Sequence, residues 1–427
     1  PATPEMKHDW AQYYDKVEDM DTWVGTKLKE LEDAGLADNT IVFYYGDHGG
    51  VLGRSKRYVY ESGTRVPFII RIPEKYKYLF PAEEPGSKVN RLISFVDLAP
   101  TLLSITGVKI PDFMQGNAFL GKQKTKSPEY VYMFRGRMDE RYDMCRAVRD
   151  EEFRYIRNYM PYRIYGQHLN YLWRAPSMRS WERAYLEGGC NEIQSVFWNK
   201  KPAEELYDTE NDPWEVDNLA NDPQYRDVLV RMRKANKEHA LKIYDTGFIP
   251  EATLALRAGK TPYYDYMRSG KVPLDKIIEA AETATLCQGD CLDKYKKFLK
   301  NEDSAIRYWG ATGLLMSGEE ACGAIPGLEG ALNDTSPDVV VVAAEALYNL
   351  GHKKTALKAL MEVLSNAGEK ARCHALNTID FLNINSKDIQ KKVVEMVSNA
   401  GTENRNKYDI RIANWLLEKW GTGTSAN

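Results

Sequence analysis

Three side chains that can do chemistry lie close together in the stretch TIVFYYGDHGGVLGRSKRYVYESG, residues 40–63. Asp47 and His48 directly follow an apolar run, and Lys56 follows them after a short basic loop. Adjacent oxygen and nitrogen donors can serve as two ligands of a divalent cation. A lysine beside such a cation is favoured when an anion lies between the two charges, so this set indicates a site for a sulfate or phosphate group.

A simpler interpretation of the same residues stays open. Asp47 can end a strand and cap a turn beside a solvated His48, and Lys56 can be an ordinary surface charge. We interpret Glu61, Gly63 and Arg65 as structural residues that set the turn into the next strand.

The surrounding pattern predicts an α/β layer that positions these residues. Apolar side chains at steps of three or four predict an amphipathic helix over residues 10–34, ended by Gly35. TIVFYY and VPFIIRIP predict two strands, the first of them buried on both faces. In an α/β sheet, ligands bind beyond the carboxyl ends of strands, which is where Asp47 and His48 stand.

The character of the sequence changes twice after this layer. Residues 142–150 and 151–160 predict two strands of an antiparallel hairpin. Residues 305–318 and 339–351 superpose with a period of 33, which predicts stacked helical hairpins that resemble HEAT repeats. We therefore expect an α/β core over residues 1–125, a small antiparallel subdomain over 126–250, and a linker with an all-α helical-repeat domain over 251–427.

Composition limits the partners of the chain. Its 427 residues carry a net charge of −3, which gives no general attraction to nucleic acid. No segment approaches the roughly 20 apolar residues that span a bilayer. Of six cysteines only Cys287 and Cys291 are closely spaced, and we interpret them as structural or as a local disulfide rather than as a metal site.

Four ordered stretches carry a resemblance to a known family: GLADNTIVFYYGDHGG, KRYVYESGTRVPFIIRIP, SFVDLAPTLLSITGV with PDFMQG, and ELYDTENDPWEVDNLA. Together they resemble the C-terminal half of a type I, formylglycine-dependent sulfatase of the alkaline phosphatase superfamily, over about residues 9–225. The resemblance implies hydrolysis of sulfate esters, or of N-sulfo groups, of a sulfated carbohydrate. It also implies a periplasmic or secreted location.

The resemblance assigns roles to the residues of the opening stretch. Asp47 matches the aspartate that ligates the active-site metal, usually Ca²⁺ in this family, and His48 occupies the adjacent ligand position, where members carry Asn or His. A nitrogen ligand is less typical of calcium, so the identity of the divalent ion stays open. Lys56 matches the lysine that contacts the sulfate.

The family nucleophile is a formylglycine made from Cys or Ser in a C/S-x-P/A-x-R motif. Its hydrated aldehyde attacks sulfur, the alcohol leaves, and the sulfated gem-diol then eliminates sulfate. We assign no residue here to that motif: Cys145 is followed by Arg-Ala-Val-Arg and Cys190 by Asn-Glu-Ile-Gln. We expect the formylglycine and the remaining metal ligands in a preceding N-terminal half, and we expect these residues alone to be inactive.

Substrate recognition is predicted less directly. Arg135, Arg137 and Arg141 can bind carboxylates or further sulfates of a glycan, or can form a solvated salt-bridged loop. His168, beside Tyr171 and Trp173, can line a sugar subsite or pack in the core. The helical repeats are expected to mediate protein contacts or to brace the rest of the chain.

Two rival functions remain at this point. One is a non-catalytic binding or scaffold protein that keeps a degenerate sulfatase-like layer. The other is a phosphodiester or phosphonate hydrolase of the same superfamily, because it would share the Asp-His metal pair.

Overall fold

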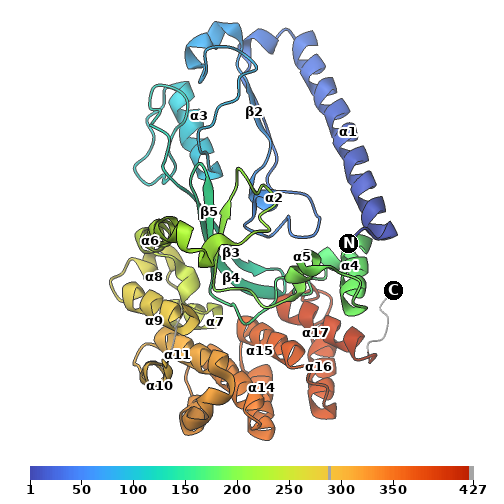
Figure 1. Ribbon diagram of the computed structural model, residues 1–427, viewed down its shortest axis with the longest axis vertical. Helices are drawn as coiled ribbons and strands as arrows, with labels where there is room; N and C mark the ends of the chain where they lie inside the picture. Colours follow the sequence, from blue (N-terminus) through green and yellow to red (C-terminus); the bar gives the residue numbers. More distant parts are fainter. Residues whose placement is uncertain (287–289, 423–427) are drawn as a thin grey trace.

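In the computed structural model, which describes residues 1–286 and 290–422, the chain forms three parts along its long axis (Figure 1). An N-terminal part with a long helix and a strand pair stands at one end, an antiparallel sheet lies in the middle, and a helical region forms the other end. The predicted fold class is confirmed: an α/β part, a small antiparallel subdomain and an all-α region. Cys287 of the predicted cysteine pair lies outside the described residues.

The predicted N-terminal helix is present as α1 (Pro4–Asp33), which packs against α4 (Pro176–Leu186). The Thr3 hydroxyl caps it by accepting a hydrogen bond from the Met6 amide (3.1 Å), and Gly35 follows its end with φ +68°. No residue of α1 is buried. Its apolar stripe is partly covered: Val24 and Leu31 are half-buried, and the Met20 sulfur accepts from the Tyr44 hydroxyl of the following strand (3.4 Å).

The two predicted strands form an antiparallel pair, β1 (Val42–Tyr45) with β2 (Phe68–Arg71). The expected burial of β1 on both faces is wrong, because no residue of β1 is buried and Tyr45 is 46% exposed. Within the described part of the chain, β2 is its only strand partner. Two short helices flank the pair, α2 (Glu61–Thr64) before β2 and α3 (Leu98–Thr106) after it.

The central sheet has the order β3-β4-β5-β6 and is antiparallel throughout. Neighbouring residues of a strand point to opposite faces: Ala147 and Ile156 pack on one face of the sheet, and Val148 and Tyr155 on the other. The second face is covered by α6 (Arg226–Ile243). The predicted hairpin is confirmed as β4 and β5, and the strands are β3 (Val131–Met138), β4 (Arg141–Arg149), β5 (Phe153–Asn158) and β6 (Glu204–Asp208).

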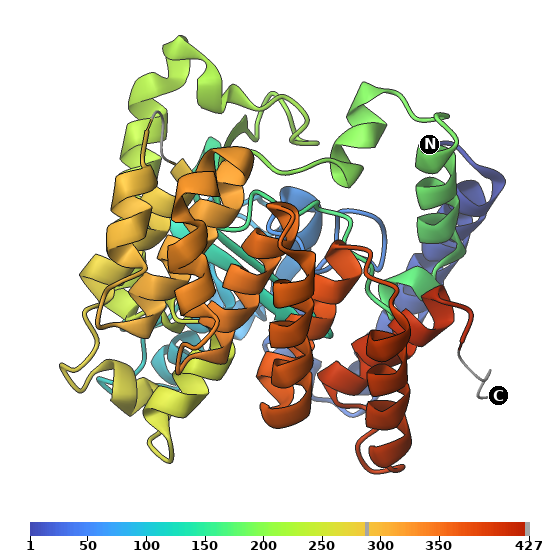
Figure 2. The same cartoon turned by 90° about the horizontal axis from the view of Figure 1, so that it is seen from below.

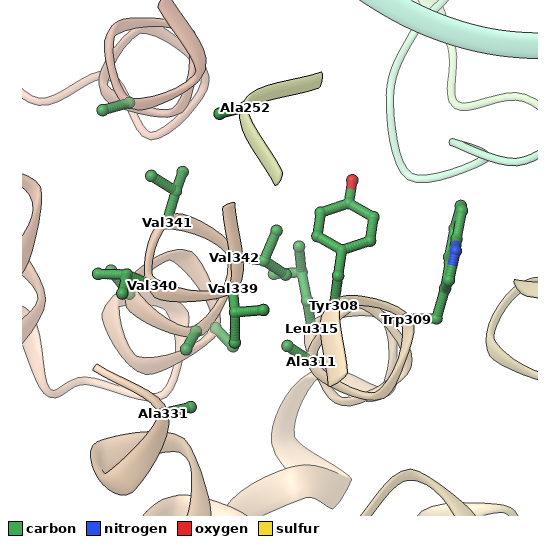
Figure 3. Packing of buried hydrophobic residues seen from close by; sticks show 14 of the residues in the cluster. Ala252, Tyr308, Trp309, Ala311, Leu315, Ala331, Val339, Val340, Val341 and Val342 are labelled. Atoms are coloured by element: carbon green, nitrogen blue, oxygen red, sulfur yellow. The ribbon is translucent and has the colours of Figure 1, made fainter. Parts of the chain in front are cut away.

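The helical region repeats close to the predicted period. Helices α11, α13 and α15 begin at Ser304, Pro337 and Glu369, and side by side they form an inner row (Figure 2). Small side chains such as Ala311 let Val339 and Val342 of α13 pack closely (Figure 3). The other bounds are α5 (Glu192–Ser195), α7 (Glu251–Ala258), α8 (Tyr263–Met267), α9 (Leu274–Leu286), α10 (Leu292–Phe298), α11 (Ser304–Ser317), α12 (Ile325–Ala331), α13 (Pro337–Asn349), α14 (Lys353–Asn366), α15 (Glu369–Phe381), α16 (Lys387–Asn399) and α17 (Tyr408–Lys419).

The helical region shares its core with the sheet. Met144 and Tyr159 belong to the same buried cluster as the repeat helices. The indole of Trp309 in α11 donates to the carbonyl of Phe248 (3.0 Å). None of the helices in the described ranges is both long and apolar enough to cross a bilayer.

Candidate functional site

The loop that follows β1 is folded tightly back on itself. The Lys56 amide donates to the carbonyl of Gly50 (3.1 Å), and the Gly49 amide donates to the carbonyl of Gly63 (3.1 Å). A Cβ at Gly49 would lie 1.9 Å from the Ser62 carbonyl oxygen, so only glycine allows this approach. The loop thereby holds His48 and Lys56 in one compact unit.

Asp47 and His48 present donors that fit a cation. The Nδ1–H of His48 donates to the carbonyl of Gly49 (2.7 Å), which leaves the lone pair of Nε2 free as a ligand. That nitrogen lies 3.4 Å from a carboxylate oxygen of Asp47, whose side chain is 83% exposed. With a neutral imidazole two acceptors face each other here, an arrangement that a divalent cation stabilises.

The two residues do not by themselves make a complete metal site. A hard divalent cation takes six or more ligands. Among the described residues no group of three or more His, Cys, Asp or Glu side chains could hold a metal ion. Asp47 and His48 thus fit as two ligands of a larger set, and the remaining ligands are not brought to them within the described part of the chain.

The backbone on both sides of Lys56 is held in an unfavourable conformation. Arg54 and Arg57 have φ of +61° and +79°, in the left-handed region that side chains other than glycine avoid. Such strain costs on the order of 1–3 kcal/mol per residue and is typical of functional sites. The Lys56 ammonium lies 5.1 Å from the ring centre of Tyr171, and the Arg57 guanidinium 4.8 Å from the same ring.

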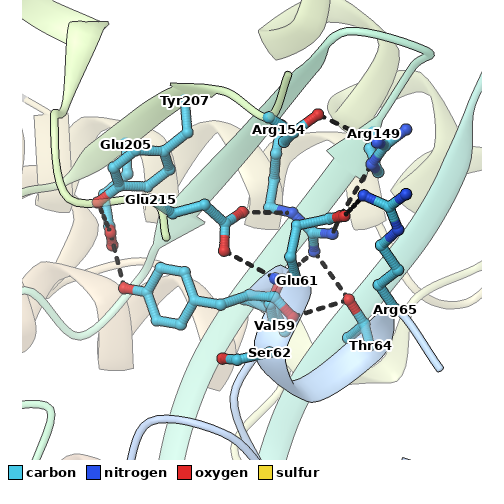
Figure 4. A network of polar contacts seen from close by, with 12 residues as sticks. Val59, Glu61, Ser62, Thr64, Arg65, Arg149, Arg154, Glu205, Tyr207 and Glu215 are labelled. Carbon is cyan, nitrogen blue, oxygen red and sulfur yellow. Dashed lines mark hydrogen bonds and ion pairs between the residues drawn. The ribbon is translucent and has the colours of Figure 1, made fainter. Parts of the chain in front are cut away.

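A buried polar network fastens this loop to the sheet (Figure 4). The Glu61 carboxylate pairs with Arg149 (2.9 Å) and with Arg154. Arg154 also pairs with Glu215 (2.8 Å), and the Glu215 carboxylate accepts from the Glu61 amide (2.7 Å). The structural roles predicted for Glu61 and Gly63 fit these contacts, since a Cβ at Gly63 would lie 2.3 Å from the Tyr58 carbonyl.

A cavity of about 820 Å³ opens beside Lys56. Its lining joins the loop, the segment after β5 and the last described helix, α17. Asp47 and His48 are not among the described residues that line it. The charged and aromatic lining residues are Lys56, Arg57, Arg174, Arg179, Arg405, Arg411, Asp139, Glu182, Glu418, His168, Tyr171, Trp173 and Trp415.

His168 lies in this cavity, between two tryptophan rings. Its ring stacks on Trp415 of α17 at 3.5 Å and lies 4.9 Å from Trp173. Burial, together with the positive charge of Arg141, lowers the pKa of His168 to about 3. His168 is thus a neutral imidazole at ordinary pH, suited to hydrogen bonding rather than to carrying charge.

The three arginines predicted for substrate binding lie elsewhere. Arg135 is buried, pairs with Asp143 (3.4 Å) and stacks over Tyr58. The Nε–H of Arg137 donates to Glu251 of α7 (2.6 Å). Neither guanidinium lines the cavity.

Arg141 is also occupied inside the protein. It is buried and pairs with Asp380 of α15 (2.5 Å). Burial and pairing leave Arg135 and Arg141 no free face for a glycan. Arg137 is half-buried and lines a separate pocket, so the predicted substrate role stays a prediction. Arg137 and Arg141 instead join the β3–β4 hairpin to the helical region.

The assignment of the cysteines needs a correction. Cys145-Arg-Ala-Val-Arg149 does fit the letters of the C/S-x-P/A-x-R pattern, with alanine in its third place. Cys145, however, lies inside β4 and is buried, and its thiol donates to the Asn158 side chain (3.0 Å). Burial raises the pKa of this thiol to about 12. Its position in the sheet core does not suit a nucleophile.

Comparison with known proteins agrees with the resemblance. The family model described as Sulfatase matches residues 2–108. This part of the chain is therefore similar to the sulfatase family. An ulvan-active sulfatase of Formosa agariphila is 45% identical over 255 residues, which cover 60% of this chain and 42% of the relative. The human N-sulphoglucosamine sulphohydrolase is 26% identical over 248 residues, 55% of this chain and 48% of the relative.

Solved structures that share part of this chain are similar to it only at a low level. One of them, determined in complex with its substrate D-glucosamine-2-N,6-O-disulfate, has a TM-score of 0.39 and 23% identity and covers 54% of this chain and 40% of that one. The chain spans less than half the length of both curated sulfatase relatives.

Sequence reasoning missed one side of the cavity. Arg405, Arg411 and Trp415 come from the end of the helical region, which we expected only to mediate contacts or to brace the chain. No local spacing marks these residues as site residues. They reach the loop that carries Lys56 through the packing of α17 against α15 and through the ion pair of Arg411 with Asp139.

Proposed function

We propose that this chain is part of a sulfatase that hydrolyses sulfate esters of a sulfated carbohydrate, with Lys56 contacting the reacting sulfate. The cavity beside Lys56 carries the proposal: six basic side chains line it against three acidic ones, together with aromatic rings. Anionic sugars suit such a lining, because guanidinium and ammonium groups bind sulfate and aromatic faces stack on sugar rings. The names of the relatives, an ulvan-active sulfatase and an N-sulphoglucosamine sulphohydrolase, support the same substrate class.

Each residue of the loop has a separate task in this proposal. Lys56 has no acidic partner among the described residues, so its full charge is available to the sulfate oxygens as negative charge shifts onto them. Asp47 and His48 are two ligands of a divalent cation, with Ca²⁺ as the first candidate. When bound, the cation adds positive charge beside the same anion.

The nucleophile and the remaining metal ligands are proposed to come from residues outside this chain. Cys145 is buried in the sheet and does not fill that role. We expect the isolated 427-residue chain to release no measurable sulfate with Ca²⁺ present. Turnover at an ordinary enzyme's rate would show that these residues suffice.

The decisive experiment measures sulfate release from ulvan oligosaccharides by the natural full-length protein. Lys56→Ala should cost roughly 2.7–4 kcal/mol of transition-state stabilisation, a loss of about 10²–10³ in rate, by analogy with removal of one oxyanion donor. Chelation should abolish turnover, and added Ca²⁺ should restore it.

Lys354→Ala is the matched control, because Lys354 is exposed on α14, far along the chain from the cavity lining. An unchanged rate for Lys56→Ala would remove this residue from the sulfate site. Faster cleavage of a phosphodiester than of a sulfate ester would instead favour the phosphodiester hydrolase.

A further inference from the structure

We infer that the helical region completes the substrate pocket and that Arg405, in the turn before α17, binds a second anionic group of the sugar chain. The inference rests on the proposed function for the class of ligand. It adds a role for a part of the molecule that lies outside the residues matched by the sulfatase model, 2–108.

Three contacts place the end of the helical region at the cavity. Asp139, in the β3–β4 turn, pairs with Arg57 of the loop (2.5 Å) and with Arg411 of α17 (3.1 Å). The Trp415 ring stacks on His168 at 3.5 Å with an interplanar angle of 10°. The loop that carries Lys56 and the helix that follows Arg405 are therefore held by shared partners.

The basic side chains of the cavity fall into two groups. Arg57 and Arg411 share the single carboxylate of Asp139 as an ion-pair partner. Lys56, Arg174, Arg179 and Arg405 form no ion pair within the described ranges. Unpaired cations from the loop and from the helical region thus line one cavity from different parts of the chain.

The size of the cavity favours a ligand larger than one sulfated sugar. A volume of about 820 Å³ lies in the upper part of the range of ligand sites, roughly 300–1,000 Å³. A ligand whose reacting sulfate meets Lys56 would bring a further sulfate or carboxylate to Arg405, whose guanidinium can bind either one with two hydrogen bonds. The occupant is accordingly an oligosaccharide with at least two anionic groups.

The test measures dissociation constants of the 427-residue chain, without any need for turnover. The ligands are an ulvan oligosaccharide and, as a comparison with a single anionic group, N-acetylglucosamine 6-O-sulfate, both followed by titration calorimetry. Arg405→Ala should weaken the oligosaccharide about tenfold and leave the monosaccharide within about twofold, since one charge-assisted contact is removed. Arg226→Ala is the control, because Arg226 is exposed at the start of α6 and does not line the cavity.

Chemically modified oligosaccharides identify the second anion. If the loss caused by Arg405→Ala persists with a desulfated oligosaccharide, Arg405 binds a carboxylate. If it persists with a carboxyl-reduced oligosaccharide, Arg405 binds a sulfate.

Two results would overturn the inference: an oligosaccharide affinity in Arg405→Ala equal to that in Arg226→Ala, or no oligosaccharide binding by the unmodified chain. Neither depends on turnover. Weakened binding in Lys56→Ala with unchanged binding in Arg405→Ala would remove the role of Arg405 and leave the proposed sulfate site standing. If Arg405→Ala weakens oligosaccharide binding as expected but the full-length protein releases no sulfate, the role of Arg405 stands and the proposed sulfatase activity is wrong.

Discussion

Single side chains in the cavity differ in how they meet an anion. Lys56 carries a free charge beside Tyr171, whereas His168 is held neutral between Trp173 and Trp415. A neutral imidazole can donate one hydrogen bond to a sugar hydroxyl or sulfate without adding charge. Charge and hydrogen bonding are thus supplied by separate residues.

The lowered pKa of His168 makes a prediction about stability. Its ordinary value is 6.5 and burial takes it to about 3 in the folded chain, so between these values the unfolded chain binds more protons. Folding stability should therefore fall as pH drops below about 6.5. His168→Phe keeps an aromatic ring against Trp415 but cannot titrate, and it should remove at most about 3 kcal/mol of this loss by pH 4.

Urea unfolding at pH 7 and pH 4 measures the effect. His8→Phe serves as the control, because the His8 side chain is 75% exposed. Equal acid destabilisation of the natural chain and of His168→Phe would mean that His168 is not held neutral by burial.

At the scale of elements, the loop after β1 depends on the sheet for its shape. Glu61 at the start of α2 is buried and pairs with Arg149 and Arg154 from β4 and β5. Burial alone would raise the pKa of Glu61, but Arg154 and Arg149 hold it below its ordinary value. This pairing stabilises the fold above the ordinary carboxyl pKa and is lost as the pH falls through the lowered one.

Removing this carboxylate should destabilise the chain strongly at neutral pH. Glu61→Gln leaves the buried Arg154 with one acidic partner instead of two, and breaking a buried pair costs about 3–5 kcal/mol. Glu362→Gln on α14, at an exposed site, is the control and should change little. Urea titrations measure the free energy of unfolding of each variant. A loss below about 1 kcal/mol for Glu61→Gln would show that the buried network contributes little to stability.

At the scale of the whole molecule, the sheet and the helical region behave as one packed unit. Arg163, after β5, makes two hydrogen bonds of 2.6 Å to Glu345 of α13, and both side chains are buried. Met144 and Tyr159 extend the helical core onto the sheet. A shared core of this kind favours cooperative unfolding.

Calorimetry should accordingly show one transition for the sheet and the helical region together. Glu345→Gln alone leaves the buried Arg163 without its carboxylate partner and should cost about 3–5 kcal/mol, whereas Arg163→Met with Glu345→Leu should recover most of that loss. Two separate transitions in the natural chain would show that the helical region folds independently.

The sequence by itself determined the elements and the loop. Helix α1, the strands β1, β2, β4 and β5, and the repeat of helices all follow from local periodicity and end at residues that the sequence marks. The family motifs also singled out Asp47, His48 and Lys56 in advance. Their metal and sulfate roles stay predictions.

Only the tertiary structure decided which charges are free. Arg137 pairs with a glutamate 114 residues away and Arg411 with an aspartate 272 residues away, and no local pattern encodes such partners. The same long-range packing engages the arginines that we predicted to bind substrate in ion pairs inside the protein. It also places Arg405 and Trp415 in the cavity beside Lys56. Secondary structure depends on neighbours along the chain, whereas burial and ion pairing depend on neighbours in space. The cavity is formed by residues that are neighbours only in space.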